Sequence, residues 1–467
     1  MNTLARAKLF ARRSPLSAIA LSTCACLLAL SAVLGSSAPG TPAESVRLES
    51  SKPWKYIVIV DAGSSGCRAH VFKWRELSSG LRGHNAAVEV DATHNSFKVK
   101  PGLSSFATNT AAAGPSLAPM LEFVDKEVPE AERAATAIFL KATAGLRMTA
   151  PAARDSILAS VRGTLTASAY KFVDDQAMVI DGVDEGGFGW MSVNYLLGNL
   201  QAGQSKGSVT VVEMGGASAQ VTQLSQAPSR ATGPAQSKLP TGYEFDFDLG
   251  DQHFDLYTHS YLGFGLEQAR EALSAKAAAG NDPCLQRGFA ANGADKRASV
   301  YDGKAGVDVK GGASGKDCAA AVESHVFADK LAAKCNVVPC SFNGVFQPAY
   351  VTASPLLIFE NFFYTAKMLG IAADGTATPN DFFKAGDEVC GLEWLALAEA
   401  FPKDGSDKAE LSKLCFSAQY LGLFLTKGLG VGADTKIRVQ QAVGDHGIDW
   451  SLGAALLEAA RIASGAR

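Results

Sequence analysis

Two short segments with the same pattern, about 150 residues apart, constrain the fold more than any other feature of the chain. In the first, a run of mostly β-branched residues ends at Asp61, small residues follow, and alternating polarity resumes at Ala69. In the second, a similar run ends at Glu213, Gly215 and Gly216 follow, and the alternation begins again. Each pattern predicts a strand, a tight turn and a second strand. The repetition predicts two duplicated lobes.

The residues in these turns are suited to holding phosphate groups. Glycine lets the backbone approach a ligand closely, and the hydroxyls of Ser64 and Ser65 with successive backbone N–H groups can surround phosphate oxygens. Asp61, at the end of its strand, is placed to face the metal ion that accompanies phosphates. A single glycine turn between strands is common, but two matched turns, each following a carboxylate, predict a phosphate chain held between the lobes.

Two further segments lie between the hairpins. Residues 137–147 predict a strand that runs into Thr143, Gly145 and Arg147, although an ordinary strand-to-helix turn with a surface arginine fits as well. Residues 184–197 predict an apolar helix that opens with Asp184, Glu185 and glycines. The alternative is that the acid at the start of this helix only caps its first turn and complements the helix dipole.

The N-terminus carries an uncharged apolar run at residues 16–34 behind several basic residues. Its length is close to the 17–25 residues, roughly, that cross a bilayer, and the basic flank favours a cytoplasmic N-terminus with the rest translocated. We favour a signal-anchor over a signal peptide cleaved near residues 36–38, and both over a buried core helix. The first interpretation predicts a single-pass type II membrane protein with a lumenal (Golgi or endoplasmic reticulum) or extracellular domain. Cleavage would give a secreted or periplasmic protein.

Six cysteines lie between residues 284 and 415, and this even number behind a translocation signal predicts three disulfides. Six cysteines allow 15 pairings, and free thiols in a reducing cytosol are the alternative. None of these cysteines has a histidine partner at zinc-finger spacing, which argues against structural zinc. Cys67, inside the first turn, is not one of these six cysteines.

Charge and composition exclude one class of partner. The chain is 47% hydrophobic and 19% charged, as globular proteins usually are, and its net charge is -3. Without a long basic run, a nucleic-acid partner is not expected. Small acidic molecules remain possible ligands because a few local groups can bind them.

In this order and spacing, the four segments resemble the first four signature motifs of the apyrase family of nucleoside triphosphate diphosphohydrolases. A fifth motif is recognisable at residues 259–265, and the similarity continues at 281–284, 335–346, 415–420 and 449–453. The resemblance implies an α/β fold of two RNase H-like lobes, as in the actin-like ATPase superfamily, with the active site in the interlobe cleft. We expect the chain to begin with a cytoplasmic tail and apolar segment at 1–35, followed by a stem at 36–53. Lobe one should span 54–180, with residues 430–467 returning to it, and lobe two should span 181–429.

The resemblance also implies roles for individual residues. Asp61 and Glu213 are expected to hold Mg²⁺ or Ca²⁺ largely through water, Glu185 to act as general base, and Ser218 and Gln220 to hold the attacking water. The phosphate-binding and nucleotide-binding residues are expected to be Ser64, Ser65, Gly66, Arg68, Thr143, Arg147, Gly215, Gly216, Ala217 and, against the nucleobase, Tyr364. The implied disulfides are Cys284–Cys318, Cys335–Cys340 and Cys390–Cys415.

The reaction implied by the resemblance is metal-dependent hydrolysis of terminal phosphates of nucleoside tri- or diphosphates. Water attacks the phosphorus directly and in line, without a phosphoenzyme. The alternatives are an exopolyphosphatase-type phosphatase, which has related glycine hairpins, a membrane-anchored nucleotide-binding protein without turnover, and a sugar kinase. The sequence leaves open the nucleobase, the preference for tri- or diphosphates and for Mg²⁺ or Ca²⁺, and the oligomeric state.

Three positions depart from the family pattern. Glu213 stands where an aspartate is usual, which moves the carboxylate by about 1.5 Å, still within reach of a water-mediated metal contact. Cys67 replaces a small or hydroxyl residue and is expected to be a buried thiol. Ala219 replaces a more common hydroxyl residue, with a mild effect expected.

Overall fold

The computed structural model describes residues 52–77, 88–200, 207–226, 239–250, 252–276, 282–289, 314–400 and 408–465. The apolar run at 16–34 and the stem up to residue 51 lie outside these ranges, so the predictions for them stay predictions. Among the described residues, no helix combines the length and the apolar character needed to cross a membrane.

The first hairpin forms the centre of a six-stranded sheet in the described chain. Strands β1 (Lys55–Ala62) and β2 (Cys67–Glu76) are antiparallel, with Asp61 opposite Arg68. Strands β5 (Ala137–Ala142) and β6 (Ala177–Val179) continue the sheet in parallel with β1, whereas β3 (Val88–Val90) and β4 (Asn95–Val99) pair with β2. The middle of β1 is buried on both faces, as an uninterrupted apolar run requires.

The second hairpin is the centre of a seven-stranded sheet with a matching arrangement. Strands β7 (Thr210–Met214) and β8 (Ser218–Leu224) are antiparallel, and β11 (Leu356–Glu360) and β13 (Ile437–Val439) follow β7 in parallel. The edges are β10 (Gln252–Leu262) with β9 (Glu244–Leu249), and β12 (Thr376–Ala377). The order β8-β7-β11-β13 repeats β2-β1-β5-β6, which confirms the predicted duplication. A small pair, β14 (Ala442–Val443) and β15 (His446–Gly447), precedes the last helix.

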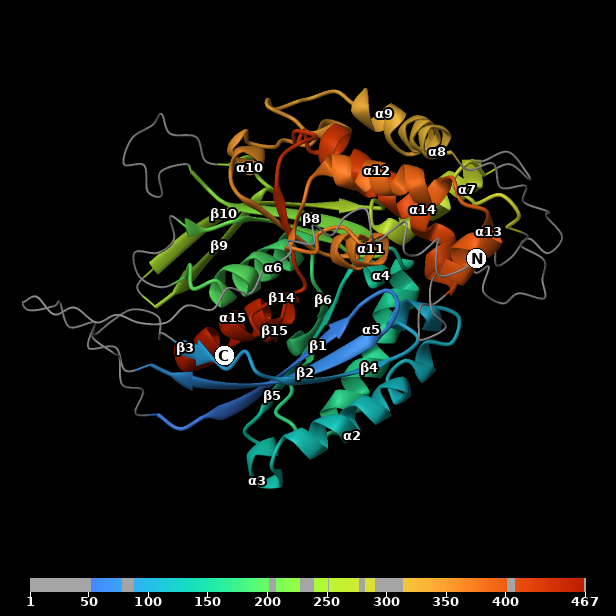
Figure 1. Ribbon diagram of the computed structural model, residues 1–467. Helices are drawn as coiled ribbons and strands as arrows, with labels where there is room; N and C mark the ends of the chain where they lie inside the picture. The colour runs from blue at the N-terminus through green and yellow to red at the C-terminus, as the bar shows by residue number, and fades with distance from the viewer. Residues whose placement is uncertain are drawn as a thin grey trace, which may run out of the picture. The chain divides into compact units, whose positions relative to one another are not determined.

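Two helices, α6 (Gly182–Leu196) and α15 (Ser451–Ala463), lie between the two sheets (Figure 1). Their apolar side chains share one core cluster with residues of both sheets, such as Phe72 and Leu357. The helices approach closely at Gly453, where a Cβ would lie 2.1 Å from the carbonyl oxygen of Phe188. The core therefore joins the two halves directly behind the hairpin turns.

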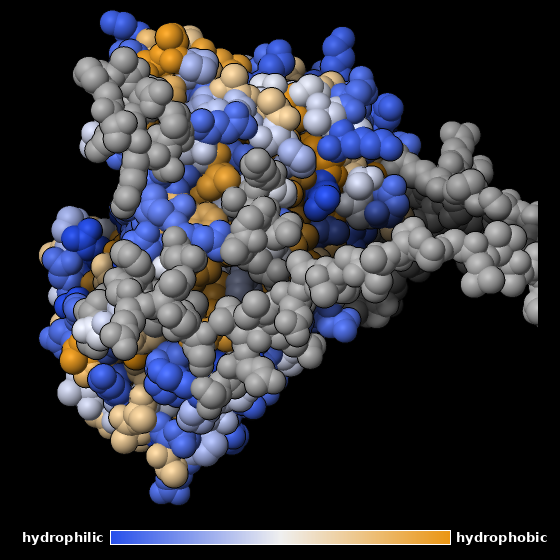
Figure 2. Space-filling model, turned by 90° about the vertical axis from the view of Figure 1, so that its left-hand side faces the viewer, coloured by the Kyte–Doolittle hydropathy of each residue, from blue (hydrophilic) through white to orange (hydrophobic). Residues whose placement is uncertain are grey.

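The other faces of the sheets are covered by separate sets of helices (Figure 1). The first sheet packs on α2 (Ala118–Glu127) and α5 (Pro151–Thr166), and the second on α11 (Asn361–Leu369), α12 (Pro379–Cys390) and α14 (Lys408–Leu423). Further helices are α3 (Glu130–Arg133), α4 (Ala144–Arg147), α7 (Leu266–Lys276), α8 (Gly315–Val322), α9 (Ala328–Leu331), α10 (Tyr350–Ala353) and α13 (Trp394–Ala400). On the face drawn in Figure 2, hydrophilic residues are spread over the visible described surface and apolar residues form smaller patches.

The last helix is largely buried. Glu458 and Arg461 interrupt its apolar residues and indicate an amphipathic helix of a soluble domain rather than a membrane span. In the structure α15 is buried over Ser451–Ala460, and only Arg461 of these two charges is exposed. Glu458 is tolerated inside because its Oε1 accepts a hydrogen bond of 2.9 Å from the ammonium group of Lys141, on β5.

The three disulfides of the structure join Cys284 to Cys318, Cys335 to Cys340, and Cys390 to Cys415. These are the pairs that the family resemblance implies. They link α8, α12, α14 and the segments beside them, all on the outer side of the second sheet. Cys67 is a buried free thiol, and burial raises its pKa to about 12, so it is not a nucleophile.

Candidate functional site

The carboxyl ends of four parallel strands meet at one cavity between the two sheets, with a volume of about 140 Å³. In α/β sheets this is where ligands bind. The cavity is lined by Asp61, Gly63, Ser64, Ser65, Gly66, Arg68, Lys98, Thr143, Ala144, Glu185, Glu213, Gly215, Gly216, Ala217, Ser218, Glu360, Asp449 and Trp450. Both predicted turns, one from each half of the duplication, therefore face the same space.

The second turn presents backbone N–H groups to this cavity. Its carbonyl oxygens accept hydrogen bonds from the start of α7 and from the loop before it. Leu266 N–H donates to Gly215 and Glu267 N–H to Gly216, each at 2.9 Å, and Gly263 N–H donates to Ala217 at 2.8 Å. In a trans peptide the N–H points away from the carbonyl, so the amides that follow these carbonyls point to the opposite side. Successive amides of this kind form a concave site for an anion.

Glycine is required where this loop meets the turn. A Cβ on Gly265 would lie 2.3 Å from the backbone nitrogen of Ala217, closer than atoms can approach. Gly265 ends the fifth sequence motif, so the motif serves to hold the second turn in position. The first turn has a similar contact, because a Cβ on Gly66 would lie 2.5 Å from the carbonyl oxygen of Val99, on β4.

Two carboxylates face each other at the ends of β1 and β7. Asp61 Oδ1 and Glu213 Oε2 are buried and have no hydrogen-bond partner within the described part of the chain. Burial, and then the charge of Glu185, raise the pKa of Asp61 to about 8, and the pKa of Glu213 is raised well above its usual range for the same two reasons. Buried oxygens without partners are unfavourable unless a proton or a cation compensates them. They fit the oxygen ligands that Mg²⁺ and Ca²⁺ prefer, directly or through water.

The side chain of Glu213 lies next to a glycine, Gly189, which leaves space for it. A Cβ on Gly189, in α6, would lie 3.3 Å from Glu213 Oε2, so a larger residue there would crowd the carboxylate. This glycine leaves room for the extra methylene that distinguishes Glu213 from the aspartate usual in the family.

Glu360, at the end of β11, is a further cavity carboxylate that the sequence analysis missed. Its backbone has φ 58° and ψ −123°, a conformation that costs a non-glycine residue about 1–3 kcal/mol. The Gln441 side chain hydrogen-bonds both the backbone and the carboxylate of Glu360. Its Oε1 accepts from the Glu360 N–H at 2.8 Å, and its Nε2 donates to Glu360 Oε1 at 2.9 Å. The signal was present in the sequence, because the β11 run also ends in an acid, like those of β1 and β7.

Glu185 lies at the start of α6 but does not cap the helix. That role belongs to Asp181, whose carboxylate accepts a hydrogen bond from the Asp184 N–H at 2.8 Å. The buried Glu185 carboxylate instead pairs with the guanidinium of Arg147 and accepts a hydrogen bond from Gln220 Nε2 at 3.0 Å. Burial raises the pKa of Glu185, and Arg147 opposes this shift.

Gln220 connects Glu185 to its surroundings. Its Nε2 also lies 2.7 Å from Ser218 Oγ and 3.0 Å from Ser260 Oγ, in the fifth motif, so three oxygen acceptors share its two hydrogens. Its Oε1 is buried with no hydrogen-bond partner among the described residues. A water molecule between Glu185, Ser218 and Gln220 would find both donors and acceptors there.

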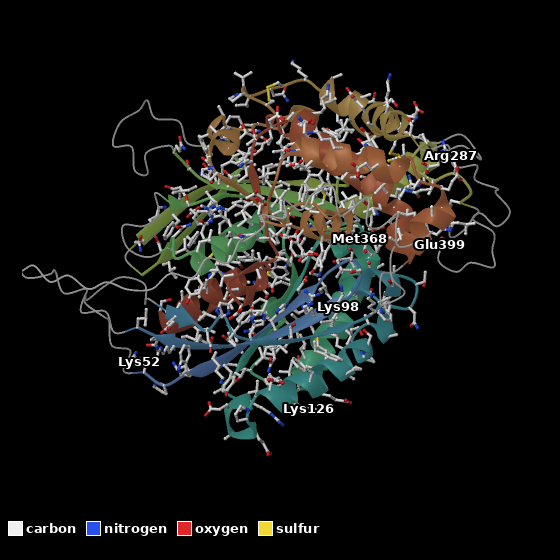
Figure 3. The ribbon with its side chains drawn as sticks, in the orientation of Figure 1. Lys52, Lys98, Lys126, Arg287, Met368 and Glu399 are labelled. Carbon is white, nitrogen blue, oxygen red and sulfur yellow. A yellow bond between two sulfur atoms is a disulfide. The ribbon has the colours of Figure 1, made fainter. Side chains whose placement is uncertain are left out.

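Lys98 and Arg68 supply positive charge on the side of the first turn. Lys98 lies on β4, directly opposite Arg68 in the register of the sheet, and its ammonium group donates to Ser65 Oγ at 3.2 Å. Figure 3 shows it on the first sheet, below α11, which carries the labelled Met368. Sequence reasoning missed Lys98 because only the pairing of β4 with β2 brings it to the cavity.

Most predicted site residues line the cavity, and three do not. Arg147 and Gln220 lie behind Glu185, which they contact. Tyr364 is outside the cavity lining and 47% exposed, one turn beyond Glu360 on α11. Burial and the charge of Glu360 raise the pKa of Tyr364.

Comparison with known proteins agrees with this geometry. The model of the GDA1/CD39 (nucleoside phosphatase) family matches residues 47–464. Similar curated proteins are the probable apyrase 4 of Arabidopsis thaliana, 32% identical over 87% of this chain and 79% of the relative, and the guanosine-diphosphatase of Schizosaccharomyces pombe, 30% identical over 88% and 75%. The human ectonucleoside triphosphate diphosphohydrolase 2 is 31% identical over 85% of this chain and 81% of its own length.

A solved structure shows the same fold. The crystal structure of nucleoside triphosphate hydrolases from Neospora caninum superposes with a TM-score of 0.61 and 16% identity, over 88% of this chain and 93% of that one. The expected α/β fold with two lobes is thereby confirmed. The chain belongs to the GDA1/CD39 (nucleoside phosphatase) family.

Proposed function

We propose that this protein hydrolyses the terminal phosphates of nucleoside tri- or diphosphates with the help of a divalent cation. The observation that carries the proposal is the arrangement of one cavity: two phosphate-binding turns, the unpartnered oxygens of Asp61 and Glu213, and Glu185 beside them. Five carboxylates line this cavity together with the cationic side chains of Arg68 and Lys98, and this excess of acidic groups favours a bound cation.

In the proposed reaction a water molecule attacks the terminal phosphorus directly and in line. Glu185 accepts the proton of that water, and its raised pKa brings it closer to neutral pH, where a general base is most effective. Gln220 and Ser218 orient the water through the hydrogen-bonding groups that face Glu185. Arg147 holds the Glu185 carboxylate in place, and no covalent enzyme intermediate is needed.

The turns and cationic residues bind the phosphate chain and stabilise the charge of the transition state. The amides that follow Gly215, Gly216 and Ala217 act on one side, and Ser64, Ser65, Arg68 and Lys98 act on the other. Asp61 and Glu213 hold Mg²⁺ or Ca²⁺, and such an ion, when bound, would withdraw electron density from the phosphate oxygens. Tyr364 is the residue we assign to stacking on the nucleobase, because its exposed ring accepts any base.

The N-terminal apolar run completes the proposal. We infer that it anchors the protein with the catalytic domain on the lumenal or extracellular side. The three disulfides support an oxidising compartment for this domain. Cleavage of the run would leave the same domain secreted or periplasmic.

The proposal is tested by phosphate release from ATP, ADP, GTP, GDP, UTP and UDP, using residues 50–467. Each nucleotide is measured with Mg²⁺, with Ca²⁺ and with excess EDTA. We expect metal-dependent release from tri- or diphosphates and none from monophosphates, with EDTA abolishing turnover. Hydrolysis of long-chain polyphosphate instead of nucleotides would favour the exopolyphosphatase alternative, and binding without release would favour a protein without turnover.

Lys98 gives a second test, because its ammonium group donates to Ser65 of the first turn and lines the cavity. Lys98→Met is expected to raise KM about tenfold or more, since a hydrogen bond to a charged group contributes about 1.5–3 kcal/mol. Steady-state kinetics of this variant and of Lys98→Arg, which keeps the charge, measure the effect. Lys126→Met, on the exposed side of α2, is the matched control (Figure 3). Equal KM values for Lys98→Met and Lys126→Met would contradict a role in phosphate binding.

A further inference from the structure

A second group of potential metal ligands lies beside the nucleotide cavity. His70, His94 and Asp449 each offer one ligand atom, and these atoms all lie within 4.8 Å of one another. His70 Nδ1 is 2.9 Å from His94 Nε2 and 3.7 Å from Asp449 Oδ2. The three residues come from β2, from the turn between β3 and β4, and from the segment that leads into α15, so only the tertiary structure brings them together.

We propose that His70, His94 and Asp449 form a binding site for a transition-metal ion of the Zn²⁺ type, separate from the Mg²⁺ or Ca²⁺ held by Asp61 and Glu213. Two imidazole nitrogens and one carboxylate oxygen are ligands that Zn²⁺ favours, whereas Mg²⁺ and Ca²⁺ favour oxygen alone. The proposal does not depend on the reaction proposed above.

The separations suit a single ion. Zinc binds nitrogen at about 2.0–2.1 Å, so two nitrogens on one ion lie no more than about 4.2 Å apart. The distances from His70 to His94 and to Asp449 are both shorter than this. A small movement of the half-buried Asp449 carboxylate brings the remaining pair into the same range, and water completes the coordination.

The surroundings orient each ligand atom. His94 Nδ1 is 3.0 Å from the carbonyl oxygen of Ala92, to which it donates, so the lone pair of this ring is on Nε2, facing His70. Ligand histidines commonly have such a backbone partner. Asp449 uses Oδ1 to accept hydrogen bonds from the N–H and hydroxyl of Ser451, which leaves Oδ2 towards His70.

His70 can adopt the tautomer that binding requires. In the structure its Nδ1 donates to His94 Nε2 at 2.9 Å, and its Nε2 is buried with no hydrogen-bond partner among the described residues, so metal binding would replace one hydrogen bond and shift the proton to Nε2. When the proton moves to Nε2, Nδ1 presents its lone pair to the ion. Phe72 holds both rings in place, with its centroid 5.9 Å from that of His70 and 4.2 Å from that of His94.

The site has its own access route. His94 is half-buried and lines a second cavity, of about 260 Å³, together with the carboxylates of Asp91 and Glu127 and the ammonium group of Lys73. An ion can therefore reach His94 without passing the hairpin turns. Asp449 lines the nucleotide cavity as well, so an ion at this site would lie next to the proposed catalytic carboxylates.

The experiment titrates Zn²⁺ into the full-length protein in excess Mg²⁺, which fills the oxygen-only site, and follows binding by calorimetry. We expect one Zn²⁺ per chain, and an affinity at least about tenfold lower in His94→Ala, because even loss of an outer-shell partner costs this much. His446→Ala, which removes a histidine outside the cluster, should bind like the original protein, and so should Asp61→Asn. Unchanged binding in His94→Ala, or loss of Zn²⁺ binding only in Asp61→Asn, would overturn the proposal.

X-ray absorption of the original protein gives a measurement that needs no variant. With one equivalent of Zn²⁺ in excess Mg²⁺, we expect the scattering pattern of two imidazole rings on the bound ion. A shell of oxygen ligands alone would refute the site even if His94→Ala failed to fold. Neither result depends on nucleotide hydrolysis, so failure of this site and failure of the proposed enzymatic function are distinguishable.

Discussion

Replacing Glu185 with glutamine is expected to lower kcat by about 10²–10⁴-fold, the contribution of a well-placed general base. The amide keeps the size of the side chain but cannot take the proton of the attacking water. KM should change little, because the turns and cationic residues that bind phosphate are untouched. Phosphate release under saturating nucleotide and metal measures the effect.

Asp184→Asn is the matched control, since Asp184 is the adjacent acid in the same helical turn and does not line the cavity. Its kcat should stay close to that of the original protein. Circular dichroism should show both variants folded. If Glu185→Gln retained most of its turnover with the same metal requirement, Glu185 would not be the base.

Replacing Glu458 with alanine is expected to reduce the free energy of unfolding by about 3–5 kcal/mol, the cost of leaving one partner of a buried ion pair alone. Lys141 and Glu458 are 4% and 0% exposed at their side chains, so water cannot solvate the remaining ammonium group. The pair joins β5 to α15, and its loss should loosen the last helix. Denaturant unfolding followed by fluorescence measures the change.

Two further variants distinguish the effect of burying the Lys141–Glu458 pair from the effect of its charges. Lys141→Met combined with Glu458→Leu should recover most of the stability, because an apolar pair of similar volume needs no charge partner. Glu393→Gln removes a partner of Arg287 in an exposed pair and should cost at most about 1 kcal/mol. A loss in Glu458→Ala no larger than that in Glu393→Gln would show that water reaches the buried pair.

The sequence predicted the two hairpins well, because each is encoded by residues that are close together in the chain. A β-branched run, an acid at its end and small residues after it favour a strand and a tight turn. Asp61, Glu213 and the two turns could thus be located from the chain alone, and their repetition predicted two lobes.

The sequence was less informative wherever a residue depends on distant parts of the chain. The charges of α15 indicated an amphipathic helix rather than a membrane span, but its pattern did not reveal that the helix packs in a core shared with α6 and both sheets. Lys98 reaches the cavity only through the pairing of β4 with β2. Glu360 had a sequence signal, an acid after an apolar run, but its strained backbone is set by Gln441, 81 residues later.

The sequence by itself determined the two hairpins and the acid that ends the first strand of each, since turn geometry and strand formation are local properties of the backbone. The tertiary structure alone decided which charges share one space: five carboxylates around a cavity, Lys141 beside Glu458, and His70 with His94 and Asp449. The physical reason is that burial and electrostatic coupling depend on distances through space, which strand pairing and helix packing fix only when the chain folds.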